Sequence, residues 1–216
     1  MKILTLFPAL FASFTLACLG ASDLPKVLIM GDSISMGYTS HVIENLKGVA
    51  EVKRHKGNAG PTIRGVAKIE EWLGDGKWDL IHFNWGLWDM YGWEYHKDDR
   101  SPEAYGKRLE SLVGRLKKTG AKLIWATTTP ACPAKEITME RRFKQDIRIS
   151  PGLERKYLDA ALGVMKKNDI QVNDLYAFMK PQRAKYAVAE NNVHYKPDGK
   201  IALGKKVSDC IADALK

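Results

Sequence analysis

The residue best suited to chemistry is Ser33, in the sequence Gly31-Asp32-Ser33. An apolar run of Val, Leu, Ile and Met precedes this triplet and predicts a buried strand, and a helical pattern follows it. A Ser at the carboxyl end of the first strand lies where α/β sheets bind ligands, and the next helix offers unpaired N–H groups there. Ser33 could therefore act as a nucleophile, and the helix N-terminus could stabilise the oxyanion that its attack creates on the substrate. In the alternative interpretation, Asp32 and Ser33 only cap the helix.

Polar motifs also follow the next two expected strands and precede the last helix. They are Asn58-Ala59-Gly60, Gly86-Leu87-Trp88-Asp89 and Asn191-Asn192-Val193-His194. In a parallel sheet, the carboxyl ends of all strands meet at one edge. We therefore expect these motifs to lie close to Ser33.

Apolar periodicity and turn residues predict the elements that position these motifs. After the first strand and helix, we expect strands over 49–54, 79–85, 121–127 and 170–172, and helices over 62–73, 101–120, 152–167, 175–179 and 197–215. Residues 87–100 and 128–150 are expected to be loops. Alternation of strands and helices predicts a three-layer α/β/α sandwich with a flavodoxin-like, five-stranded parallel sheet. By analogy with such folds, we expect the strand order 2-1-3-4-5.

The N-terminal segment differs from the rest of the 216-residue chain. Met1-Lys2 precedes an apolar stretch, and small residues follow it, as in a secretory signal peptide. We expect residues 1–21 to be a signal peptide, 22–216 to be a single domain, and the mature protein to be secreted or periplasmic. No stable membrane association is expected, unless the chain is lipidated at Cys18. The alternative is an intracellular lipase-like enzyme whose N-terminus is not cleaved.

Composition restricts the partners. Lys and Arg number 34 and Asp and Glu 25, a net charge of +9, and the excess is scattered along the chain. We interpret it as a soluble basic surface and expect no nucleic-acid partner, because no nucleic-acid-binding module accompanies it; attraction to an acidic polysaccharide is the alternative. No spacing typical of metal ligands and no phosphate-binding glycine loop is present, so neither a metal nor a cofactor is expected. Cys132 and Cys210 could pair in an oxidising compartment.

Together, the four motifs resemble those of the SGNH (GDSL-type) hydrolase family, in order and over the whole mature chain. The resemblance implies ester hydrolysis in which Ser33 is the nucleophile and His194 the general base. It further implies an oxyanion hole made by the N–H groups of Ser33 and Gly60 and by a side chain of the third motif. A glycine at position 60 would let the substrate approach the backbone.

Two residues depart from the family pattern. Trp88 stands where the family has an Asn, so either its indole N–H or the nearby Asn84 could donate to the oxyanion; Trp88 could equally be a wall of the site. Asn191 stands where the family has the Asp of the triad. Its carbonyl can orient His194 but cannot stabilise imidazolium by a full charge, which implies a Ser–His dyad or a weakened triad. The alternative is a degenerate protein that binds glycans without hydrolysing them.

The segment 87–100 is rich in aromatic residues. Trp88, Trp93 and Tyr95 are candidate substrate-binding residues, because flat aromatic faces beside a hydrolytic site suit sugar rings; alternatively, they only pack the loop. The sequence therefore predicts an exported carbohydrate esterase, and we expect acetyl groups as its target. Lipid or thioester substrates remain alternatives.

Overall fold

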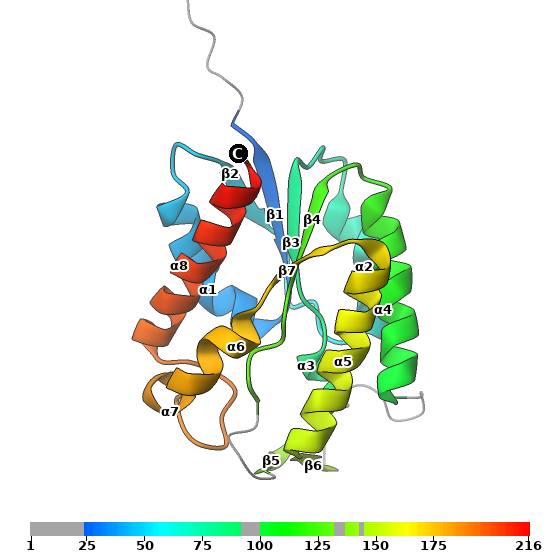
Figure 1. Cartoon of the computed structure of the whole chain (residues 1–216), viewed down its shortest axis with the longest axis vertical. Helices are drawn as coiled ribbons and strands as arrows, with labels where there is room; N and C mark the ends of the chain where they lie inside the picture. The colour runs from blue at the N-terminus through cyan, green and yellow to red at the C-terminus, as the bar shows by residue number, and fades with distance from the viewer. Residues whose placement is uncertain (1–23, 92–99, 132–136, 143–144) are drawn as a thin grey trace, which may run out of the picture.

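The computed structural model describes residues 24–91, 100–131, 137–142 and 145–216. Its centre is a parallel sheet in the order β2-β1-β3-β4-β7 (Figure 1). The strands are β1 (Lys26–Met30), β2 (Glu51–Arg54), β3 (Leu80–Phe83), β4 (Lys122–Ala126) and β7 (Gln171–Asn173). The strand order 2-1-3-4-5 predicted from the sequence is confirmed, with β7 as the fifth strand.

Helices cover both faces of this sheet (Figure 1). One face carries α1 (Ser33–Asn45), α6 (Leu175–Met179), the short α7 (Arg183–Tyr186) and α8 (Pro197–Ala214), and the other carries α2 (Thr62–Leu73), α3 (Leu87–Tyr91), α4 (Pro102–Lys117) and α5 (Pro151–Asn168). A 3₁₀ turn, η1 (Lys180–Gln182), joins α6 to α7. The predicted three-layer α/β/α sandwich is confirmed. Within the described ranges, no helix is long and apolar enough to cross a membrane.

The sheet separates two apolar clusters, because successive side chains of a strand point to opposite faces. In β1, Val27 and Ile29 pack under α1 and α8, whereas Leu28 and Met30 pack under the helices of the other layer. β1, β3 and β4 are buried almost throughout, as expected for central strands of a parallel sheet. This double burial explains why they read as nearly continuous apolar runs.

Capping residues set the starts of the helices that matter for the site. The Asp32 carboxylate accepts from the N–H of Ile34 at 2.9 Å and begins α1 directly after β1. Ser101 caps α4 with a bond from the N–H of Ala104 at 3.1 Å, and Pro102 occupies the first helical position, as the sequence indicated. Ser33 therefore lies in the first turn of a helix that directly follows β1, one of the inner strands of the sheet.

Two segments contain more structure than their sequence indicated. A short helix, α3, begins the segment expected to be the loop 87–100. Part of the expected loop 128–150 forms an antiparallel pair, β5 (Ile137–Arg142) and β6 (Gln145–Ile149). Both strands are rich in charged residues, so the apolar alternation that reveals a strand in a sequence is weak there.

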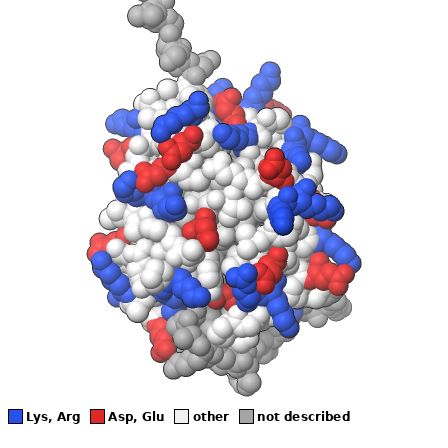
Figure 2. Space-filling view, viewed as in Figure 1, with Lys and Arg blue, Asp and Glu red and all other residues white. Residues whose placement is uncertain are grey.

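Charged side chains of both signs are interspersed over the face seen in Figure 2, without a continuous basic field. Among the described residues, surface ion pairs include Lys53 with Glu51 and Lys205 with Asp209. On this face, the distribution matches the scattered excess of basic residues in the sequence.

Candidate active site

Ser33 and His194 meet at the carboxyl edge of the sheet. The Oγ of Ser33, the first residue of α1, lies 3.0 Å from Nε2 of His194, which precedes α8. The two residues are 161 positions apart in the chain, and both side chains are partly exposed. A hydroxyl within hydrogen-bond distance of an imidazole is the arrangement by which a base activates a serine nucleophile.

The partner of the other imidazole nitrogen is Asn192, not Asn191. The Oδ1 of Asn192 lies 3.0 Å from Nδ1 of His194 and also accepts from the backbone N–H of His194 at 2.9 Å. A side chain two residues before a backbone N–H can close such a short turn, whereas the Asn191 side chain is exposed. The role predicted for Asn191 is therefore reassigned by this geometry to its neighbour.

This contact selects the imidazole tautomer. Because the Asn192 oxygen can only accept, Nδ1 of His194 carries the proton and Nε2 is left as an acceptor for the Ser33 hydroxyl. That is the tautomer a general base requires. The neutral amide orients the ring but adds no full negative charge to stabilise an imidazolium.

Arg54, at the end of β2, holds the turn that carries Ser33. Its guanidinium donates to the carbonyl of Gly31 at 2.8 Å and to that of Asp32 at 3.4 Å. It also donates to the carbonyl of His55 at 2.9 Å and to that of Gly57 at 2.6 Å. A guanidinium presents donors in a rigid fork, so this one side chain ties the Ser33 turn to the turn after β2.

Two buried titratable groups are found at the same turn: Asp32, which is part of it, and His55, which contacts Gly31. Nε2 of His55 lies 3.2 Å from the backbone nitrogen of Gly31 and 3.0 Å from its carbonyl oxygen, and Nδ1 lies 3.1 Å from the carbonyl oxygen of Lys56. Burial lowers the pKa of His55. Burial raises the pKa of Asp32 to about 6, against the opposing effects of the Ile34 N–H and the Arg54 charge. His55 is therefore neutral near pH 7, and Asp32 is ionised at a cost to the fold.

The loop carrying His194 is held by Arg183 of α7. This buried guanidinium donates to the carbonyl of Pro130 at 3.0 Å and to that of Ala131 at 3.1 Å. It also donates to the carbonyl of Glu190 at 2.9 Å and to that of Asn192 at 3.3 Å. The segment after β4 and the histidine loop therefore share one buried cation, which fixes the position of Asn192.

The backbone N–H of Gly60, an expected oxyanion donor, already has an acceptor. It donates to Oδ1 of Asn58 at 2.8 Å. Gly60 has φ of +59°, and a Cβ on it would lie 2.7 Å from the guanidinium of Arg64. The left-handed backbone favours glycine here, and the Arg64 guanidinium occupies the space that a side chain at position 60 would fill. The N–H of Ser33, at the start of α1, has no carbonyl within the helix to bond.

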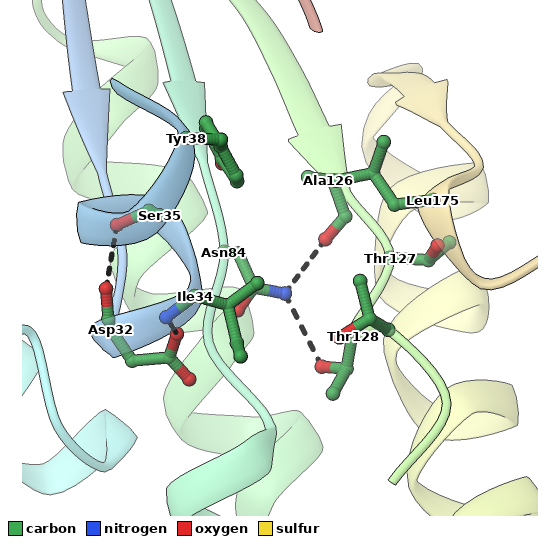
Figure 3. Close-up of a pocket in the computed structure, with 10 residues that line it drawn as sticks. Asp32, Ile34, Ser35, Tyr38, Asn84, Ala126, Thr127, Thr128 and Leu175 are labelled. Atoms are coloured by element: carbon green, nitrogen blue, oxygen red, sulfur yellow. Dashed lines mark hydrogen bonds between the residues drawn. The ribbon is translucent and has the colours of Figure 1, made fainter. Parts of the chain in front are cut away.

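Asn84, the second expected side-chain donor, is also engaged. Its Nδ2 donates to the carbonyl of Ala126 at 2.8 Å and to Oγ1 of Thr128 at 3.2 Å (Figure 3). Both partners belong to β4 and the segment after it. The small cavity of Figure 3 lies beside this amide and is lined also by Asp32 and Ile34. In this arrangement Asn84 joins β3 to β4 and does not offer its amide to an oxyanion.

The third motif has divided roles. The Asp89 carboxylate is buried and accepts from the N–H of Thr62 at 3.0 Å and from its hydroxyl at 2.5 Å, so it caps α2. Trp88 is partly buried, and the guanidinium of Arg64 lies over its ring, 5.2 Å from the centroid. Position 88 thus presents an aromatic face covered by a cation.

The remaining expectations concern the N-terminal segment, the aromatic segment after α3, the two cysteines and metal binding. The signal peptide over 1–21, with Cys18, and the candidate binding residues Trp93 and Tyr95 lie outside the described residues. Cys132 does as well, and Cys210 is a free, partly buried thiol on α8. Within the described ranges, no three His, Cys, Asp or Glu side chains gather in a way that could hold a metal ion.

Arg54, Arg183, Asn192 and Arg64 are the site residues that sequence reasoning missed. A lone arginine in a helix or at a strand end resembles any solvated surface charge. For Asn192, the Asx-turn spacing to His194 was visible in the sequence. The family pattern, which favours position 191, outweighed that signal.

The fold is shared with solved structures that include a GDSL-like lipase and a putative SGNH hydrolase. The chain superposes on an acetyl xylan esterase with a TM-score of 0.68 at 18% identity, covering 86% of this chain and 99% of that one. A lipase/acylhydrolase from Enterococcus faecalis gives a TM-score of 0.70 at 18% identity, with coverage of 89% and 98%. A GDSL-like lipase from Bacteroides thetaiotaomicron gives 0.68 at 15% identity, with 88% of each chain covered. No family model and no curated protein sequence matches the chain. At these identities, the likeness establishes the fold.

Proposed function

We propose that this protein is a serine esterase that hydrolyses carboxylic esters. The observation that carries the proposal is the 3.0 Å contact between Ser33 Oγ and His194 Nε2 at the edge of the sheet. The imidazole tautomer that accepts the hydroxyl proton is set by Asn192. The likeness in fold to an acetyl xylan esterase and to an acylhydrolase supports the same chemistry.

The reaction follows from these contacts. Ser33 Oγ attacks the acyl carbon of the ester as its proton passes to His194 Nε2. The tetrahedral oxyanion collapses, the C–O bond to the alcohol breaks, and His194 returns the proton to the leaving oxygen. Water then attacks the acyl carbon as His194 takes its proton, the bond from that carbon to Ser33 Oγ breaks to release the acid, and His194 returns the proton to Oγ. Without a carboxylate behind the histidine, the imidazolium is less stabilised than in a full triad, so we expect a modest rate.

For the substrate, we propose acyl groups, acetyl in particular, on a carbohydrate outside the cytoplasm. The apolar N-terminal stretch supports export, and the aromatic residues after β3 suit sugar rings. One of the structures with this fold is an acetyl xylan esterase. Release of acetate from acetylated xylan and from p-nitrophenyl acetate, measured side by side, tests this assignment.

The esterase proposal is tested at Ser33. The purified protein should release p-nitrophenol from p-nitrophenyl acetate and should be labelled by a fluorophosphonate at one residue, Ser33. Ser33→Ala should lose both properties. Ser40→Ala, an exposed serine on the same helix, is the matched control and should keep them. Hydrolysis that survives Ser33→Ala unchanged would exclude the mechanism.

A second candidate, a glycan-binding protein without hydrolysis, is favoured by one specific observation. The N–H of Gly60 and the amide of Asn84, both expected to stabilise the oxyanion, bond to other groups of the protein. Xylan binding by a protein that no fluorophosphonate labels would support this candidate. Stoichiometric labelling of Ser33 would exclude it.

A further inference from the structure

The proposed reaction needs donors for the oxyanion beyond the N–H of Ser33, because removing a single donor from such a site costs about 10²–10³ in kcat. Two of the expected donors point elsewhere. The Gly60 N–H donates to Asn58 Oδ1, and Asn84 Nδ2 donates to Ala126 and Thr128. The third position carries an indole, which has one N–H and a bulky ring.

A cation lies beside these groups. Arg64 projects from the first turn of α2, and its Nη1 donates to the carbonyl of Asn58 at 3.1 Å. Its guanidinium occupies the space next to Gly60 that a side chain at that position would fill. The same group lies over the ring of Trp88. Two of the three motifs expected to form the oxyanion hole therefore contact this one guanidinium.

The turn that holds Arg64 adjoins the nucleophile turn. The N–H of Ala59 donates to the carbonyl of Gly31 at 3.1 Å, which places the residues before α2 against those before α1. Arg54 joins the same two turns through the carbonyls of Gly31 and Gly57. Through the Asn58 carbonyl and the space at Gly60, the guanidinium of Arg64 thus contacts the turn that adjoins the Ser33 turn.

We propose that Arg64 is a catalytic residue that stabilises the oxyanion, in place of the side-chain amide expected from the third motif; this rests on the proposed esterase function. The Trp88 ring and the Asn58 carbonyl hold the guanidinium, so it is oriented before substrate arrives. As Ser33 Oγ bonds to the acyl carbon, the carbonyl π electrons move to the oxygen, and N–H groups of Arg64 donate to the resulting anion. The charge returns to the carbonyl when the alcohol leaves, and Arg64 exchanges no proton.

The role predicts a loss in the chemical step and not in binding. With p-nitrophenyl acetate, a neutral substrate, Arg64→Met and Arg64→Gln should lower kcat by about 10²–10³-fold and leave KM within about threefold of the wild type. Arg64→Lys, which keeps a charge but loses the fork, should fall between them and the wild type. Lys68→Gln, an exposed residue one turn further along α2, is the matched control and should keep its kcat.

Chemical rescue separates this role from a structural one. Millimolar guanidinium chloride should restore part of kcat to Arg64→Ala and none to Ser33→Ala, and circular dichroism should show that each variant is folded. If Arg64→Met does not fold, Arg64→Gln and Arg64→Lys carry the same comparison. Rescue with an unchanged KM supports the proposal.

Three results would overturn it. They are a kcat for the Arg64 variants that matches that of Lys68→Gln, an effect confined to KM, and the absence of rescue in a folded Arg64→Ala protein. The failure of the esterase proposal looks different. In that case the wild type itself is inactive and Ser33 is not labelled, whereas an active wild type with unaffected Arg64 variants removes only the role of Arg64.

Discussion

In the proposed mechanism, replacing Asn192 by Asp should convert a weakened triad into a full one. The new carboxylate would lie where Asn192 Oδ1 now lies, 3.0 Å from Nδ1 of His194. An opposite charge at that range raises the pKa of an imidazole by about 1–3 units, and we take the lower half of this range because both side chains are partly exposed. Each unit corresponds to about 1.4 kcal/mol of added stabilisation of the imidazolium.

The assay is the pH dependence of kcat/KM with p-nitrophenyl acetate. Its acidic limb reports the ionisation of the free enzyme's base, so Asn192→Asp should move that limb about 1–2 units to higher pH. Above the new pKa, kcat/KM should rise, because the imidazolium of the transition state is better stabilised. Below the old pKa the gain should shrink, because more of the histidine is already protonated.

Asn192→Ala should have the opposite effect. It removes the acceptor for both Nδ1 and the backbone N–H of His194. Loss of one hydrogen bond costs about 0.5–1.5 kcal/mol, and loss of the tautomer costs up to about 10⁴ in rate in a well-studied protease, so we expect a fall of about 10²-fold in kcat/KM. Asn191→Ala, at the exposed neighbour, is the matched control. Equal losses in both alanine variants, or an unshifted acidic limb in Asn192→Asp, would refute the reasoning.

Three further predictions concern stability. Burial raises the pKa of Asp32 to about 6, so ionisation of this carboxyl destabilises the fold as pH rises. Asp32→Asn should therefore raise the free energy of unfolding in urea by about 3 kcal/mol at pH 7 and by under about 1 kcal/mol at pH 4. A gain independent of pH would contradict this. Burial lowers the pKa of His82 to about 4, so this residue contributes stability above pH 6.5 that is lost as pH falls toward 4. In urea titrations, the free energy of unfolding of His82→Gln should fall by about 2.5 kcal/mol less than that of the wild type between neutral pH and pH 4.5. The same dependence of that free energy on pH in both proteins would refute this. Gly60→Ala should lower the melting temperature and displace Arg64, since its Cβ would lie 2.7 Å from the guanidinium at a φ of +59°; an unchanged melting curve would show that Arg64 yields freely.

The sheet could be predicted because its central strands are apolar on both faces and alternate with helices that have recognisable caps. Ser101-Pro102 marked the start of α4, and Gly31 marked the end of β1. The pair β5 and β6 could not be predicted, because charged residues interrupt the apolar alternation in both of its short strands. The short helix α3 escaped notice because five residues are too few to establish a helical period.

The meeting of Ser33 and His194 was predicted from motif order and strand ends, and the structure places the two side chains in contact. The supporting contacts of the site depend on tertiary geometry that no local pattern encodes. Which of two adjacent asparagines faces His194 depends on the path of a loop. Whether the N–H of Gly60 is available depends on the rotamer of Asn58. The partners of Arg54 and Arg183 come from segments far apart in the chain.

The guanidinium of Arg183 also bears on how this molecule opens. Four carbonyl groups from two distant segments converge on one dehydrated charge, so the histidine loop cannot detach without uncovering it. Loops of this kind usually fluctuate independently of the core. Here, amide hydrogens such as that of Val188, which donates to the carbonyl of His194, should exchange with solvent only when the whole domain unfolds.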